Sequence, residues 1–325
     1  MDDHIAFALH MTGPEKGERI TDEREIARAL HEERPAWLHL STDHPDTPAW
    51  IDRNLSYLDP AIRAALTEPE TRPRSLRLGS GFLVILRGIN YNEGADPEDM
   101  VSLRMYIDPY RIVSLSRQPL RSVDTLVERI VAGAGPDRAG LFLADLVELL
   151  TDRIEMQVAD LDRRADLLEA DVIGAPRDEL GSEIADQRLE LTDLKRFLGP
   201  QRDAVGGILR VSDADWLTPG DMARLTEQHD QLIRVVEALE AMRETLTTFR
   251  GEIDRARDER LNRNLYVLSV ISAVFLPLGF LTGLMGINLA GMPGAEWPPA
   301  FWTFTLGLAG ISGGVLVILK WMRVL

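Results

Sequence analysis

The chain has 325 residues, with 36 Lys or Arg against 52 Asp or Glu, so its formal net charge is -16. Such an acidic surface repels phosphate backbones and attracts cations, which makes nucleic acid an unfavourable partner. The absence of cysteine from the sequence excludes disulfides and thiolate metal ligands.

Residues 1–135 are predicted to form a cytoplasmic α/β subdomain. The chain begins Met-Asp-Asp-His, without the basic and apolar segments of a signal peptide, so we expect the amino terminus in the cytoplasm. Between about residues 36 and 118 apolar residues alternate with polar ones, as strands require. Short helices are expected near Glu23 to Glu33 and near Tyr57 to Leu66.

A metal site in this subdomain is an open question. Imidazole and carboxylate side chains are competent zinc ligands, and four of them lie close together in the sequence: His39, Asp43, His44 and Asp46. However, His39 belongs to the alternating run from Trp37 to Leu40, which is more typical of a strand before a polar turn.

Residues 136–264 are predicted to be a region of long helices. Two helical stretches, from Gly140 to about Ile173 and from Asp178 to Leu198, are separated by Gly-Ala-Pro. A stalk helix follows, because residues 221–264 contain no Pro and a single Gly. Its apolar residues recur every seven positions at Leu225, Leu232, Leu239, Leu246 and Ile253.

The stalk helix has a predicted start but no predicted stop before the apolar segment that follows it. Pro219 and Gly220 interrupt the preceding structure, which favours Asp221 as the N-cap. Since nothing breaks the chain after residue 264, we expect one helix from about Asp221 to about Met285.

Two segments are predicted to cross a membrane. Residues 265–286 are 22 residues without a charge, which as a helix would cover about 33 Å, more than the ~30 Å hydrocarbon core. Residues 300–325 contain a second uncharged stretch, 300–319, before a short cytoplasmic tail. Two such stretches are more than the buried helices of a soluble core usually show.

The charges beside these spans predict their orientation. Four arginines precede the first span (Arg255, Arg257, Arg260 and Arg263), and Lys320 and Arg323 follow the second. The loop at 287–299 has no Lys or Arg, so it should face the exterior and both termini the cytoplasm. Because two helices cannot enclose an aqueous path, transport would need several copies around an axis.

The end of the first span carries a family resemblance. Gly286, Ile287 and Asn288 are followed by Met292 and Pro293. With the order of α/β subdomain, stalk and two spans, this resembles the CorA superfamily of divalent-metal transporters, whose signature is Gly-Met-Asn followed by Met-Pro. The Ile and the stretch GINYNEGADPEDMVSLRMYI at 88–107 look more like its zinc-transporting ZntB branch.

The resemblance covers essentially the whole chain. It implies an α+β fold with an N-terminal α/β subdomain, a long helical stalk and two C-terminal transmembrane helices, assembled as a pentameric funnel in the bacterial inner membrane. The first spans would line the pore. The residues that would face it, ending at Asn288, are Asn262, Leu265, Ser269, Ser272, Leu276, Gly279 and Gly283. Their spacing of three or four residues is also what one helix face requires.

Asn288 is the predicted metal-contacting residue. Repeated around an axis, its neutral carbonyl can hydrogen-bond the water shell of a divalent ion without stripping it. The alternative is that Gly286 and Asn288 only end the helix. Glu296, the one acid of the external loop, either concentrates cations at the pore mouth or is an ordinary solvated residue.

The predicted function is transport of a divalent cation, zinc in the first place, with membrane lipid and copies of the chain as partners. The ZntB resemblance implies proton-coupled uptake, but the spans lack an acid or His to relay a proton. Alternatives are a Mg²⁺, Co²⁺ or Ni²⁺ channel of the CorA type, and a membrane-anchored scaffold or sensor that transports nothing. We predict no enzyme and no cofactor, because no catalytic or nucleotide-binding motif is present.

Overall fold

The computed structural model describes residues 4–68, 71–174, 177–211, 214–287, 294 and 296–321. The chain divides into two compact units, Met1–Arg250 and Gly251–Leu325. The long helix α7 (Pro219–Met285) begins in the first unit and continues in the second.

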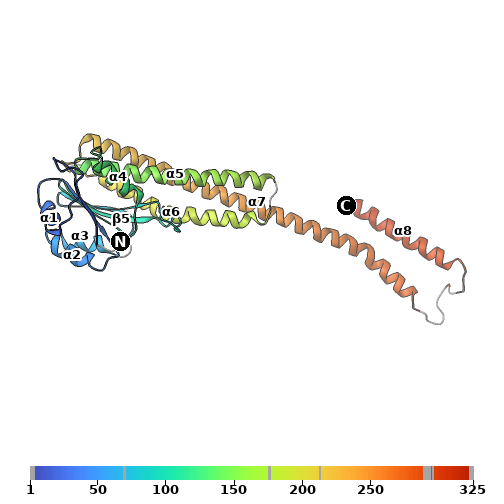
Figure 1. The fold of residues 1–325 in the computed structure, drawn as a ribbon. Helices are drawn as coiled ribbons and strands as arrows, with labels where there is room; N and C mark the ends of the chain where they lie inside the picture. Colours follow the sequence, from blue (N-terminus) through green and yellow to red (C-terminus); the bar gives the residue numbers. More distant parts are fainter. Residues whose placement is uncertain are drawn as a thin grey trace. The chain divides into compact units, whose positions relative to one another are not determined.

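The first unit contains a mixed sheet of six described strands in the order β1-β2-β6-β5-β4-β3 (Figure 1). Strand β2 pairs with β6 in parallel, and the other neighbours are antiparallel. The strands are β1 (Ile5–His10), β2 (Ala36–Ser41), β3 (Arg74–Leu78), β4 (Gly81–Gly88), β5 (Val101–Ile107) and β6 (Arg111–Ser116). The predicted strand region between about residues 36 and 118 is therefore confirmed.

Helices pack on both faces of this sheet. On one face lie α1 (Glu23–Ala29), α2 (Thr47–Asn54) and α3 (Pro60–Thr67), and their buried residues form one apolar core with Leu38 and Leu40 of β2. Side chains alternate along a strand, so Trp37 points to the other face, where its ring meets Phe142 of α5 at 4.7 Å. All residues of β2 are buried, as expected for a strand covered on both sides.

The second face carries α4 (Arg121–Val131), α5 (Ala139–Gly174) and α6 (Leu180–Leu209). Helix α6 runs past the predicted end at Leu198, although Pro200 lies inside it. Several residues after the proline are buried, among them Ala204, Val205 and Ile208. Gln201 Oε1 accepts a hydrogen bond from the Arg87 backbone N–H of β4 at 2.6 Å. Packing against the sheet thus outweighs the helix-breaking tendency of proline.

The prediction that Asp221 is the N-cap of α7 is wrong, because the helix starts at Pro219. Thr218 Oγ1 accepts from the Asp221 backbone N–H at 3.3 Å, and the Asp221 carboxylate accepts from the Thr218 backbone N–H at 2.9 Å. This is a reciprocal capping box, with proline at the first helical position, where it is well tolerated.

Asp221 also binds the guanidinium of Arg138 through both of its oxygens. Burial of Asp221 raises its carboxyl pKa, but the donors from Arg138 and Thr218 outweigh this effect and the pKa is lowered overall. The carboxylate therefore stays ionised and joins the start of α7 to the segment that precedes α5.

The seven-residue repeat of α7 is confirmed as a packing stripe. Its members are almost fully buried in the described structure: Leu225, Leu232, Leu239, Leu246 and Ile253. Within the first unit, ion pairs from Arg224 to Asp145 of α5 and from Glu240 to Lys195 of α6 place α7 beside both helices.

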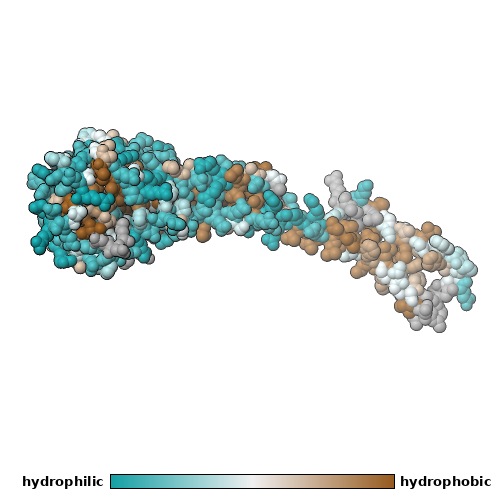
Figure 2. All heavy atoms as spheres, in the orientation of Figure 1, coloured by the Kyte–Doolittle hydropathy of each residue, from teal (hydrophilic) through white to brown (hydrophobic). Residues whose placement is uncertain are grey.

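The second unit holds the apolar end of α7 and helix α8 (Ala300–Trp321). Figure 2 shows that hydrophobic residues cover most of the visible surface of these two helices, whereas the surface of the first unit is largely hydrophilic. Within the described residues, α7 is the one helix long and apolar enough to span a membrane. Helix α8 has 22 residues, about the length that one crossing needs, and its stretch from Ala300 to Val315 is apolar.

Candidate functional site

The predicted pore-facing residues lie on one uninterrupted helix, because α7 continues through Pro277 to Met285. Two sides of this helix can be distinguished in the second unit. The partly covered side follows a helical spacing of three or four positions, with Pro277 and Leu278 as adjacent members: Tyr266, Val270, Val274, Pro277, Leu278 and Leu281. Helix α8 has a matching stripe of partly covered residues: Ala300, Phe304, Leu308, Ser312 and Val315.

These two stripes are the surfaces on which α7 and α8 approach each other. Near the end of α7, residues of both helices, among them Leu281 and Phe304, line one apolar cavity of about 740 Å³. The shared lining places the covered side of α7 toward α8.

The predicted pore face is on the other side of α7. Its seven residues, from Asn262 to Gly283, are all exposed in the single chain. At ~100° per residue, this face is centred on the order of 140° around the axis from the covered side. Helix α8 therefore leaves it open, including Leu265, which is 61% exposed, and Leu276, which is 77% exposed.

Two features make this face suitable for close contact with other copies of α7. A Cβ atom added at Gly279 or Gly283 would meet nothing within 4 Å, so both glycines leave open space. Hydroxyl groups on α7 are held close to the helix, as Ser269 Oγ donates to the Leu265 carbonyl at 2.8 Å. A serine that donates to its own helix still offers its oxygen as an acceptor to water.

The structure describes the end of α7 as far as Ile287. The Gly286 backbone N–H donates to the Thr282 carbonyl at 2.9 Å, and Ile287 is 46% exposed. Asn288, like Met292 and Pro293, lies outside the described residues, so its role stays a prediction. Glu296 lies in an exposed turn between α7 and α8.

The four candidate zinc ligands of the first unit are engaged in other contacts. The His39 ring nitrogens lie 2.8 Å from Ser114 Oγ and 3.1 Å from Ser116 Oγ. Asp43 accepts from Arg117 Nε at 2.6 Å, and His44 lies 3.9 Å from Asp46. No group of three or more His, Asp or Glu that could hold a metal is found among the residues that the structure describes.

His39 is instead a neutral core histidine. It is 3% exposed and stacks on Phe7 with ring centroids 5.1 Å apart. Burial lowers the pKa of His39 to about 4. Its imidazole is therefore uncharged at neutral pH, and serine hydroxyls satisfy both ring nitrogens.

This burial predicts a pH dependence of stability. The folded pKa of His39 lies below the unfolded value, so the unfolded chain binds the proton more readily and stability falls as pH drops below about 6.5. Between pH 6.5 and 4.5 we expect a loss of about 2 to 3 kcal/mol that His39→Gln lacks. Thermal melts of both proteins at several pH values measure it, with the exposed His31→Gln as control; parallel pH profiles for wild type and His39→Gln would contradict the assignment.

A polar cavity in the first unit could not be predicted from the sequence. It is lined by five arginines that are far apart in the chain: Arg72, Arg87, Arg104, Arg117 and Arg196. Only the folded sheet and α6 bring them together, so no motif in the sequence could have marked them.

Comparison with known proteins identifies the family. The family model described as CorA-like Mg2+ transporter protein matches residues 32–320. The chain is 36% identical over 313 residues to the divalent cation transporter CmaX of Pseudomonas aeruginosa, covering 95% of this chain and 93% of that protein. It is also 36% identical over 291 residues to the zinc transport protein ZntB of Pectobacterium atrosepticum, covering 90% and 88% of the two chains.

Solved structures agree with this fold over the full length. A structure of full-length CmaX has a TM-score of 0.85 and 33% sequence identity, and the match covers 99% of each chain. The CorA magnesium transporter from Methanocaldococcus jannaschii has a TM-score of 0.78 at 17% identity, covering 98% of each chain, which establishes a shared fold.

The predicted α+β fold with a stalk helix is confirmed, and so is the predicted class, a transporter and not an enzyme. The family match spans most of the chain, including strands β2 to β6, the long helix α7 and nearly all of α8. The chain belongs to the family of CorA-like Mg²⁺ transporter proteins.

Proposed function

We propose that the chain transports divalent metal cations across the bacterial inner membrane, with zinc as the principal cargo. One observation carries this proposal: the face of α7 that α8 leaves uncovered is the face predicted to line a pore. The similarity to proteins named for divalent cation and zinc transport supports the choice of cargo.

The transporting species is a homo-oligomer, and a pentamer is the form that we propose. One chain supplies two apolar helices, which cannot enclose water between them. With α7 around a central axis and α8 outside it, the covered stripe of α7 contacts its own α8 and the open face meets the axis. Gly279 and Gly283 would let neighbouring α7 helices approach closely.

Asn288 would recognise the ions, and the leucines of the same helix face would form the barrier to their passage. Several Asn288 amides around the axis would present carbonyl oxygens to a hydrated ion, which holds the ion less tightly than carboxylates would. Deeper along the same face, Leu265 and Leu276 would form apolar constrictions that gate by loss of water. Ser269 and Ser272 would contact the water shell between them.

Orientation follows from the cationic flanks. Arginines from Arg255 to Arg263 precede the span, and the external loop, including Glu296, has no basic residue. With both termini in the cytoplasm, Asn288 and Glu296 would face the exterior, where Glu296 attracts cations to the mouth.

The family description favours one alternative cargo, Mg²⁺, with Co²⁺ or Ni²⁺ as related ions. Zinc flux through purified protein in liposomes, with and without a pH gradient, tests zinc transport and proton coupling separately. We expect zinc uptake that the pH gradient increases. Inhibition by hexaammine cobalt together with Mg²⁺ flux would favour the alternative cargo, and flux of neither metal would contradict transport.

A further inference from the structure

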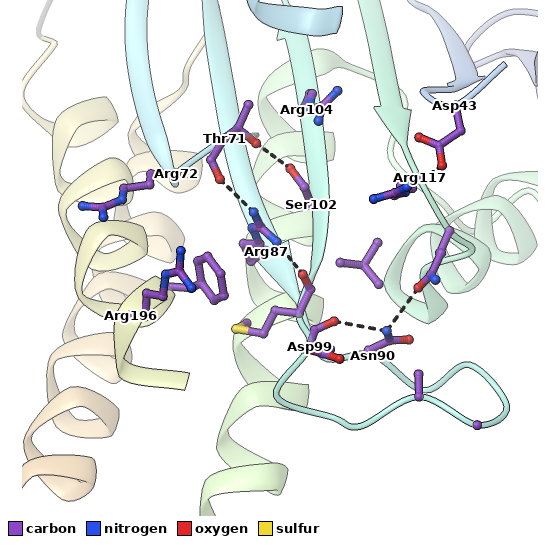
Figure 3. A pocket seen from close by; sticks show the side chains of 16 residues that line it. Asp43, Thr71, Arg72, Arg87, Asn90, Asp99, Ser102, Arg104, Arg117 and Arg196 are labelled. Atoms are coloured by element: carbon purple, nitrogen blue, oxygen red, sulfur yellow. Dashed lines mark hydrogen bonds and ion pairs between the residues drawn. The ribbon is translucent and has the colours of Figure 1, made fainter. Parts of the chain in front are cut away.

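The first unit contains a polar cavity of about 970 Å³ beside strands β4 and β5 (Figure 3). Its lining includes Arg87 of β4, Arg104 of β5 and Arg196 of α6, while Arg72 precedes β3 and Arg117 follows β6. Three secondary-structure elements and two connecting segments therefore bring cationic residues to one space in a chain whose net charge is -16.

Two of these arginines are rigidly held in the cavity wall. Arg87 donates from Nη1 to the Met100 carbonyl at 2.7 Å and from Nη2 to the Thr71 carbonyl at 2.8 Å. Its guanidinium also lies 4.1 Å from the centre of the Phe197 ring. Arg104 is 4% exposed and donates to the Leu66 carbonyl at 3.2 Å. A fixed guanidinium loses little entropy when it binds a ligand.

Among the described lining residues, the five arginines outnumber the two carboxylates, Asp43 and Asp99. Asp43 is engaged with Arg117 at 2.6 Å, and Figure 3 shows this pair on the side of the cavity opposite Arg196, with Arg87 between them. Several like charges around one cavity repel one another, and a bound anion would offset that repulsion.

We propose that this cavity binds a small phosphate-bearing anion of up to nucleotide size. Arginine forks match phosphate oxygens in pairs, and one phosphate group carries almost two negative charges in a small volume. The cavity is at the upper end of the range of ~300 to 1,000 Å³ that small ligands occupy. Asn90, Ser102 and Gln118 in the same lining add amide and hydroxyl groups for the rest of the ligand.

Isothermal titration of the full-length protein in detergent with pyrophosphate, and separately with ADP, at constant ionic strength tests this. The double variant Arg72→Gln, Arg196→Gln removes two exposed lining arginines that are not part of the packed wall. We expect saturable binding to wild type, weakened about tenfold or more in the variant, since the ligand loses charge-assisted hydrogen bonds from two arginines.

The control is Arg34→Gln, Arg129→Gln, which removes the same charge from exposed positions outside the lining. It should bind as wild type does. Absence of binding to wild type, or equal weakening in both double variants, would overturn the proposal. Tighter binding of glycerol 1-phosphate than of pyrophosphate would support the site and identify a phosphomonoester, such as a lipid headgroup, as its ligand.

A second readout separates ligand binding from contact between copies of the chain. If the lining variant lowers the oligomer mass in solution while pyrophosphate binding is unchanged, the arginines contact another subunit and the proposal fails. Titration involves no transport, so its outcome does not depend on the cation that the protein carries.

Discussion

Replacement of Asn288 by alanine is expected to reduce zinc uptake by the reconstituted protein at least about tenfold, which corresponds to ~1.4 kcal/mol. The reason is that alanine removes the side-chain oxygen that would hold the water shell of the ion, from every subunit at once. Uptake of radioactive zinc into liposomes measures the change.

A matched control is Asn264→Ala, which removes the same amide from an exposed position of α7 outside the predicted pore face. This variant should transport at the wild-type rate. Equal rates for Asn288→Ala and wild type would mean that Asn288 only ends the helix, the alternative consistent with its position after Gly286.

Leu276→Ser is expected to have the opposite effect to Asn288→Ala and to increase cation flux about tenfold. A ring of leucines around a narrow path repels water, and serine removes most of that apolar surface, so the barrier of dewetting falls by roughly 1.4 kcal/mol. Zinc flux without an applied proton gradient, measured with a zinc-sensitive dye, reports this increase.

Ile271→Ser provides the comparison, because Ile271 is also exposed and apolar but lies off the predicted pore face. Its flux should stay at the wild-type level. Higher flux in both variants would indicate general damage to the helix assembly, and lower flux in Leu276→Ser would contradict a hydrophobic constriction at that position.

Helical elements with strong periodicity could be predicted from the sequence alone. The repeat from Leu225 to Ile253 is a local pattern, and each member is buried as expected. Helix α5 likewise starts at Ala139, one residue before the predicted Gly140. Such patterns depend on the helix itself and therefore need no knowledge of the partner surface.

Two boundaries were predicted wrongly because tertiary contacts override local preference. Pro200 does not end α6, since one side of the following turns is buried where α6 packs on β3 and β4. Thr218 and not Asp221 caps α7, and the reciprocal hydrogen bonds of a capping box explain why Asp221 is needed three residues inside the helix.

The candidate sites divide in the same way. The predicted pore face follows one helix, so residue spacing alone could define it, and the structure adds that α8 covers the other side of α7. That this face lines a pore stays a prediction. The arginine cavity could not, because Arg72 and Arg196 approach each other only through the packing of α6 on β3 and β4. The candidate zinc cluster around His39 is excluded by contacts with Ser114 and Ser116 that the sequence does not show.

Cysteine scanning along α7 tests the central claim most directly, since the chain contains no cysteine of its own. Single variants at Ser269, Ser272, Leu276 and Gly279 should lose uptake after treatment with a charged, membrane-impermeant thiol reagent. Variants at Val267 and Ile271 should keep it. Unchanged uptake after treatment of the first four variants, or equal inhibition of all six variants, would contradict a water-filled path along this face of α7.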